Sequence, residues 1–299
     1  MSVSRPPAPR LLTALCYLAM MSLAIGLNLL PVFLTALSTL HGGAAGLSQE
    51  QLGRLGALTF LGLVVGILLA GPLADRFGTK PFAQLGNALI AVSLIAAAFA
   101  PSYAWLGTAL FVLGLGAGLL DMVLSPVVAA LNPERRSAAM NWLHSFYCVG
   151  AAVTILAGTV ILRLGWGWRE ACLTLVVLPL GLLVAFAPLA FPALVTDAQR
   201  LPVRRLVRRG WFLAALVAIF LGGATELGMA QWLPAYAETT LGYPAWVGGS
   251  ALLAFSVAMA LGRMVVGVIG NRMNPFHIMA WGCATSVGSP TSSRCRRCR

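Results

Sequence analysis

Long uninterrupted apolar segments constrain the fold of this chain more than any other feature. They recur along most of its 299 residues, and each holds about 20 residues or more. A helix rises about 1.5 Å per residue, so about 20 apolar residues cross a hydrocarbon layer of about 30 Å. Strands of a membrane barrel would instead alternate apolar and polar residues over about 10 positions. The sequence therefore predicts an all-α membrane protein.

The apolar segments predict about eight spans. Their expected bounds are 11–36, 51–73, 81–100, 104–131, 137–162, 169–192, 211–236 and 245–270. A basic stretch separates six of them from the rest. We therefore expect a complete six-helix half at 1–195, a basic cytoplasmic linker at 196–210, a partial second half with about two to three helices at 211–275, and an aberrant or truncated basic tail at 276–299.

The net charge of +12 is spread over short loops, which argues against a nucleic-acid partner. Most basic loop residues fall on one side of the membrane, namely Arg5, Arg10, Arg76, Lys80, Arg135, Arg136 and the five arginines of 200–209. Arg163 and Arg169 are exceptions. Basic residues favour the cytoplasmic side, so we expect a multi-pass protein of the cytoplasmic (inner) membrane, in contact with lipids, with its N-terminus in the cytoplasm.

One charged cluster interrupts the apolar sequence between the second and third spans. It contains Gly71, Asp75, Arg76, Gly78 and Lys80 within ten residues. The pattern Gly71-x-x-x-Asp75-Arg76 recurs as Gly267-x-x-x-Asn271-Arg272 after the second span of the next half. At the same offset, Gly53 matches Gly249 and Gly66 matches Gly262. This repetition indicates a duplicated six-span unit.

The Gly-x-Leu-Ala-Asp-Arg-x-Gly pattern at 71–78 resembles the signature of the major facilitator superfamily. The basic central loop and Gly165-Trp-Gly-Trp168 are also similar to that family, and the likeness extends over about residues 11–275. Thr79 departs from it, because the family usually has a basic residue there. The resemblance implies a twelve-span transporter in which the cluster at 71–80, with its second copy at Asn271 and Arg272, gates the cytoplasmic side.

The end of the chain does not continue this pattern. The apolar part of 276–299 is too short to cross a membrane, and the last six residues include four arginines. We expect a truncated or frame-shifted product, with a natural short variant as the alternative. Cys295-x-x-Cys298 has no second cysteine pair, so we expect neither a metal site nor a cofactor.

Asp121 in the fourth span is the leading candidate for solute or proton binding. A carboxylate at membrane depth costs about 3 kcal/mol and usually faces a cavity. Gly114, Gly118, Asp121 and Ser125 share one helix face, which suits a cavity wall. A buried aspartate paired with a neighbouring helix is the alternative. The glycines of this span also suit close helix packing.

The seventh span provides a second acid, Glu226. Glycines, Gln231, Trp232 and Pro234 surround it, a composition that resembles a broken helix facing a substrate. Trp232 could stack on a sugar or lie in the aromatic belt at the membrane interface.

The fifth span begins with a polar stripe of Asn141, His144, Ser145 and Cys148. His144 could relay protons or serve as a hydrogen-bonded packing residue. Asn28, beside Pro31 in the first span, is a further cavity candidate.

The motifs around Asp121, Asn141 and Glu226 resemble the fucose-permease-like subgroup, which implies sugar recognition and proton coupling at Asp121. We expect a secondary active transporter that moves a small polar solute, a sugar by this resemblance, with protons as the coupling ion. Efflux of drugs or metabolites and a nonfunctional fragment are the alternatives. The sequence has no nucleophile–base arrangement or metal-ligand cluster, so we do not expect an enzyme.

Overall fold

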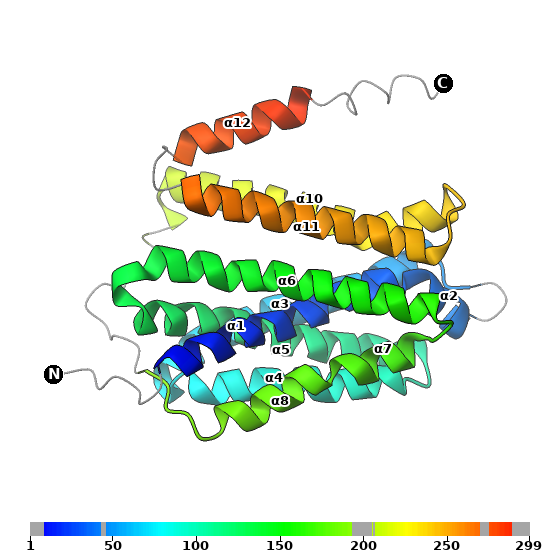
Figure 1. The fold of residues 1–299 in the computed structure, drawn as a ribbon, viewed down its shortest axis with the longest axis horizontal. Coiled ribbons are helices and arrows are strands. Elements are labelled where there is room, and N and C mark those ends of the chain that lie inside the picture. Colours follow the sequence, from blue (N-terminus) through cyan, green and yellow to red (C-terminus); the bar gives the residue numbers. More distant parts are fainter. Residues whose placement is uncertain (1–8, 43–45, 193–204, 206, 270–274, 289–299) are drawn as a thin grey trace.

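A computed structural model describes residues 9–42, 46–192, 205, 207–269 and 275–288, and the regular elements in these ranges are helices (Figure 1). They are α1 (Pro9–Val32), α2 (Leu34–Gly42), α3 (Gln49–Phe77), α4 (Lys80–Ala98), α5 (Tyr103–Leu131), α6 (Arg136–Arg163), α7 (Trp168–Leu175), α8 (Val177–Phe186), α10 (Gly210–Thr239), α11 (Ala245–Ile269) and α12 (Pro275–Gly288). The short 3₁₀ helix η2 (Pro133–Arg135) joins α5 to α6.

Eight helical segments in the described residues are long and apolar enough to cross a membrane, which confirms the expected number. The sixth consists of α7 and α8, which meet at Val176, and it ends at Phe186 rather than near residue 192. The fold is thus an all-α bundle with a complete six-span half followed by two further spans. The last helix, α12, has 14 residues and is about 21 Å long, too short to cross a hydrocarbon layer of about 30 Å.

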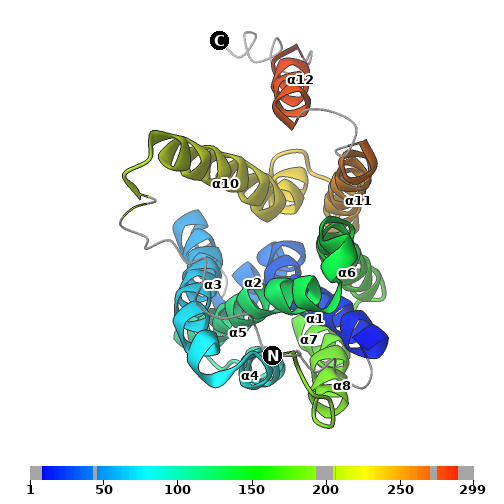
Figure 2. The ribbon, with the colours of Figure 1, turned by 90° about the vertical axis from the view of Figure 1, so that its left-hand side faces the viewer.

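Successive spans run in opposite directions, so the loops collect at two ends of the bundle. We call one the basic end, because the helix termini there carry Arg10, Arg76, Lys80, Arg135 and Arg209. The other is called the opposite end, where α2 leads into α3 and α10 leads into α11. Figure 2 shows α11 beside α6, while the beginning of α10 stands apart from the first six spans.

Close packing of α3 against α5 depends on glycines in both helices. A Cβ on Gly114 would collide with the carbonyl oxygen of Thr59, and one on Gly118 with that of Leu63. The same holds for the glycines of α3: a Cβ on Gly62 would collide with the carbonyl oxygen of Phe111 in α5, and one on Gly66 with that of Leu115. Small residues let two helices approach closely inside a membrane. The expectation that the glycines of α5 serve helix packing is therefore confirmed.

Three side chains cap the last turn of α4 at the opposite end. Trp105 Nε1, Trp168 Nε1 and Arg169 Nε donate to the carbonyl oxygens of Ala96, Ala97 and Ala98 at 3.0, 2.9 and 3.3 Å. Arg169 also lies over the ring of Phe99, 5.0 Å from its centroid. The last carbonyls of a helix lack partners within the helix. Their capping gives a physical reason for an arginine at the opposite end.

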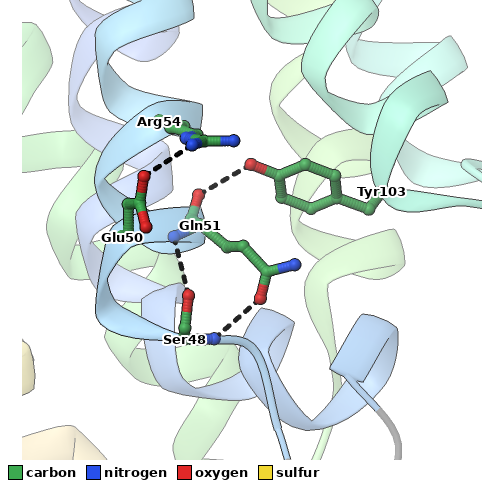
Figure 3. A network of polar contacts seen from close by, with 5 residues as sticks. All are labelled: Ser48, Glu50, Gln51, Arg54 and Tyr103. Carbon is green, nitrogen blue, oxygen red and sulfur yellow. Dashed lines mark hydrogen bonds and ion pairs between the residues drawn. The ribbon is translucent and has the colours of Figure 1, made fainter.

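The start of α3 is fixed by a second network at the same end (Figure 3). Ser48 and Gln51 form a capping box, with Ser48 N–H donating to Gln51 Oε1 at 2.8 Å and Gln51 N–H donating to Ser48 Oγ at 3.2 Å. Tyr103 Oη donates to the carbonyl oxygen of Gln51 at 2.9 Å. Glu50 and Arg54 form an exposed ion pair one turn apart. Together these contacts set the entry of α3 and tie it to α5.

Candidate functional site

A small cavity lies between the six-span half and the two spans that follow it. Its volume is about 20 Å³, and α1, α3, α6, α10 and α11 all contribute to its wall. The polar residues that line it are Asn28, Tyr147, Glu226, Gln231 and Ser256, and Phe60 and Phe255 add aromatic rings. Three residues predicted from the sequence, Asn28, Glu226 and Gln231, are thus brought together from α1 and α10.

Asn28 and Tyr147 form the wall on the side of the first half. The side chain of Asn28 is buried and donates from Nδ2 to the carbonyl oxygen of Ala24 at 2.8 Å. The same amide group reaches Tyr147 Oη at 3.4 Å. Because Ala24 precedes Asn28 by one helical turn, the first bond holds the amide against its own helix. Tyr147 then connects α6 to this position.

Gln231 forms the wall from the side of α10. Its side chain is buried, and in the described structure its Nε2 group has no hydrogen-bond partner. The amide lies on Gly56 of α3, where a Cβ would come within 2.9 Å of Nε2 and 3.1 Å of Cδ. Buried polar groups in proteins are nearly always hydrogen-bonded. An unpaired buried donor on this wall is therefore suited to an acceptor atom of a bound molecule.

Glu226 lies near the middle of α10 and is half-buried at the cavity. The expectation of a broken helix around it is wrong, because α10 runs without interruption from Gly210 to Thr239 and contains Pro234. Trp232 is half-buried, and its Cζ2 would be 3.5 Å from a Cβ at Gly53. Trp232 therefore packs near α3 and is not among the residues of the cavity wall.

Asp121 lies apart from this cavity, toward the basic end of α5. It is half-buried, as is Ser125 one turn further on, and neither lines the cavity. His144 of α6 lies within electrostatic range of Asp121. The expectation that Gly114 and Gly118 form a cavity wall is wrong, because both pack against α3.

The polar stripe of α6 is divided by the packing of that helix. Asn141 is exposed, while Ser145 is buried and donates from Oγ to the carbonyl oxygen of Asn141 at 2.8 Å. Cys148 is buried as well. Tyr147, which was not among the residues predicted from the sequence, is the residue of α6 that reaches the cavity. Tyr147 follows His144 by three residues and so shares a partly polar helix face with it, and this spacing could have pointed to Tyr147 from the sequence.

Ser256 was also missed. It is a buried hydroxyl in the apolar helix α11, and it had no polar neighbour in the sequence to draw attention to it.

The charged cluster at 71–80 lies at the basic end, where it includes the last turns of α3, the link at Gly78 and Thr79, and the first residue of α4. Gly78 has φ of +82°, a conformation that favours glycine, and its N–H donates to Ala74 O at 2.9 Å. Asp75 and Arg76 are exposed, and Gly71 lies near Met122 of α5.

Lys80 makes a contact within the first half, because its Nζ donates to the carbonyl oxygen of Ala187, just after α8, at 2.8 Å. Thr79 is buried at the start of α4. The second copy of the cluster, Asn271 and Arg272, lies outside the described residues.

The Major Facilitator Superfamily model matches residues 11–291, and the chain belongs to this family of multi-pass membrane transporters. The match extends past residue 275, where the motif resemblance ends. Among curated relatives, the gentisate transporter of Corynebacterium glutamicum is 29% identical over 80% of this chain and 57% of its own length. The cis,cis-muconate transport protein of Acinetobacter baylyi is 26% identical over 79% of this chain and 61% of its own length.

A multidrug resistance protein of Shewanella oneidensis is 28% identical over 66% of this chain and 51% of its own length. The chain therefore spans little more than half the length of these three relatives. Names in the group include two organic-acid transporters and a drug-resistance protein, so they do not fix one substrate class.

Solved structures share the fold. A D-xylose–proton symporter matches with a TM-score of 0.68 at 15% identity, over 88% of this chain and 69% of that chain. The xylose transporter of E. coli in a partially occluded inward-open conformation has a TM-score of 0.68 at 14% identity, over 89% of this chain and 74% of that chain. At these identities the likeness concerns the fold alone.

Proposed function

We propose that this chain works as a secondary active transporter of a small polar solute, with protons as the coupling ion, in the cytoplasmic membrane and with its N-terminus in the cytoplasm. The observation that carries the proposal is the cavity between the two parts of the chain, where a carboxylate, two amides and two hydroxyls meet at membrane depth. Polar groups are costly inside a membrane and usually mark a solute or ion pathway.

The lining of this cavity supports a neutral, hydroxyl-rich solute such as a sugar. Asn28, Gln231, Tyr147 and Ser256 offer hydrogen-bond donors and acceptors, and the cavity wall in the described part of the chain contains neither Lys nor Arg. Phe60 and Phe255 offer flat apolar surfaces for the face of a ring. A few well-placed polar groups in an otherwise apolar wall are typical of small-molecule sites.

Organic acids form a second substrate class, favoured by the names of the relatives from C. glutamicum and A. baylyi. An anion would meet the carboxylate of Glu226, and no cationic side chain is present among the described residues of the same wall. Such a solute therefore fits this site best when Glu226 or the acid itself carries a proton.

The coupling step that we propose is protonation of Glu226 or Asp121. An ionised carboxylate resists transfer to an apolar environment, and protonation removes most of that cost. A neutral site can then close as the two parts of the chain rock against each other around the bound solute. His144, within electrostatic range of Asp121, could relay the proton to it.

A volume of about 20 Å³ holds about one water molecule and not a sugar. Solute binding therefore requires α10 and α11 to move away from α1, α3 and α6. Alternation between such states is what a rocking transporter requires.

The test is transport by the purified chain in proteoliposomes with a proton gradient imposed in either direction. Labelled hexoses and labelled aromatic acids are offered separately, and unlabelled competitors identify the preferred class. We expect hexose accumulation that depends on the gradient and falls at least tenfold in Asp121→Asn. Unchanged proton-driven hexose uptake in Asp121→Asn would exclude coupling at Asp121, and accumulation of aromatic acids alone would select the second class.

A further inference from the structure

The cavity at Gln231 has the size of a single water molecule. Its volume of about 20 Å³ exceeds the roughly 10–15 Å³ that a water molecule needs and is far below what a solute needs. A cavity of this size stays empty when its wall is apolar and is hydrated when two to four polar groups face it. Five polar side chains line this one.

The decisive group is the amide of Gln231. Gln231 as a whole residue is 91% buried, since 9% of its surface remains exposed, and its Nε2 atom has no hydrogen-bond partner in the described structure. The amide cannot turn freely toward α3, because Gly56 is packed directly beneath it. A buried donor of this kind is normally satisfied by protein or by an ordered water.

Residues that carry acceptor oxygens line the same space from both parts of the chain. Asn28 and Tyr147 come from α1 and α6, while Glu226 and Ser256 come from α10 and α11. A water molecule that accepts from Gln231 has two protons left, and each part of the chain offers oxygens to receive one. An ordered water of this kind typically makes about three hydrogen bonds.

We propose that this cavity binds one ordered water molecule, which accepts a hydrogen bond from Gln231 Nε2 and bridges α10 to the Asn28–Tyr147 pair. Its role in transport rests on the proposed function. The water occupies the position that a hydroxyl or carboxyl oxygen of the solute takes when the cavity opens. Its bridge holds the two parts together while no solute is bound.

Water fits the observed groups better than a monovalent cation does. A cation in this space would face the amide donor of Gln231 as well as the carboxylate of Glu226, and an N–H group repels it. A water molecule can accept from the amide and donate to the carboxylate at the same time. Salt dependence of stability distinguishes the two occupants. A bound cation would stabilise the protein only in a salt that supplies it, whereas a bound water molecule is present in every salt.

The experiment is a high-resolution structure of the whole chain in lipid nanodiscs without solute, for the wild type and for Gln231→Met. Methionine is similar in length and lacks the donor. We expect a density peak within about 3.2 Å of Gln231 Nε2 in the wild type and its loss in the variant. A well-ordered Gln231 with no neighbouring density, or with Nε2 bonded directly to a protein acceptor, overturns the proposal. If Gln231→Met does not fold, the wild-type structure decides alone.

Thermal unfolding in sodium, potassium and choline chloride at equal ionic strength provides the second arm. We expect the same midpoint in all three salts. A saturable rise in sodium that disappears in Glu226→Gln would assign the cavity to a cation and overturn the water site. Neither measurement uses transport, so the water site and the proposed transport function can fail independently.

Discussion

Gln231 and Gly56 form the contact on which the geometry of the site depends most directly. The amide of Gln231 lies flat on Gly56, and three residues earlier on α3 the ring of Trp232 lies near Gly53. The two glycines differ in the space above them. A Cβ would come within 2.9 Å of Nε2 at position 56 but stay 3.5 Å from the indole at position 53, an ordinary van der Waals distance.

These distances predict different outcomes for two similar substitutions. Gly56→Ala should displace the Gln231 amide and weaken solute binding about tenfold, equivalent to about 1.4 kcal/mol. Gly53→Ala should leave binding within about a factor of two, because its Cβ meets Trp232 only at an ordinary van der Waals distance. Solute affinity measured by counterflow in proteoliposomes compares the two. Equal affinities for both variants would show that Gln231 does not contact the solute.

Single residues of the site were predictable where a polar type stands out in apolar sequence. Asn28, Glu226 and Gln231 were found in this way, and the structure brings them together. Tyr147 and Ser256 were missed because tyrosine and serine are common in apolar helices. Which helix face meets which neighbour depends on tertiary packing, as Gly114 and Gly118 show by facing α3.

At the scale of elements, the pair α3 and α5 is the most closely packed part of the first half. Its glycines bring backbone against backbone, so an added methyl group has no side chain to push aside. A glycine in a helix is otherwise unfavourable relative to alanine by about 1 kcal/mol. A Gly→Ala change should therefore lower stability where the glycine packs against a neighbouring backbone, and should raise it slightly where the space beside the glycine is open.

Gly118→Ala should destabilise the protein by about 1–3 kcal/mol, because the new methyl group collides with the backbone of α3. Gly181→Ala is the matched control in α8, where no atom lies within 4 Å of a Cβ, and it should be neutral or slightly stabilising. Thermal unfolding in detergent compares the two variants. Equal midpoints would contradict backbone contact between α3 and α5.

The capped end of α4 gives a second prediction about elements. Trp168→Phe keeps an aromatic ring but removes the indole N–H that donates to Ala97 O, and it leaves part of the buried indole space unfilled. The variant should therefore lose about 1–3 kcal/mol of stability, from one hydrogen bond and some buried packing. Trp166→Phe is the control, because Trp166 is exposed. Unfolding midpoints measure both. A larger loss for Trp166→Phe would contradict the capping role of Trp168.

Elements were easier to predict than sites, because length and hydropathy determine a membrane helix almost alone. All eight expected spans are present. The meeting of α7 and α8 at Val176 and the continuity of α10 through Pro234 were not predictable. Proline and glycine are tolerated in membrane helices when neighbouring groups satisfy the backbone, which the sequence of one helix does not reveal.

At the scale of the whole molecule, the two parts of the chain touch mainly toward the opposite end. Thr35 Oγ1 donates to Glu238 Oε2 at 2.6 Å, and Arg163 lies 5.8 Å from the ring of Trp246. Gly249 of α11 packs directly on the side chain of Thr159. Toward the basic end, by contrast, the first half of α10 exposes large apolar residues, among them Leu213, Leu216, Val217, Phe220 and Leu221.

Loss of the Thr35–Glu238 hydrogen bond should favour opening at the opposite end. Thr35→Val removes the donor without changing side-chain size, and about 1 kcal/mol shifts the population several-fold. The readout is maleimide labelling of Ser256→Cys from that side, in a chain whose Cys283, Cys295 and Cys298 are serine. Thr39→Val is the control, because Thr39 donates only within α2, to Ala36 O. Faster labelling in Thr39→Val than in Thr35→Val would contradict a latch at Thr35.

Proton-coupled transport through the cavity at Glu226 is tested most directly by one pair of Glu→Gln variants in proteoliposomes. Glu226→Gln removes the carboxylate at the cavity, while Glu50→Gln makes the same change in the exposed ion pair with Arg54. We expect Glu226→Gln to lose accumulation driven by a proton gradient and to keep solute exchange, with Glu50→Gln like the wild type. Undiminished gradient-driven accumulation in Glu226→Gln would contradict coupling at this site.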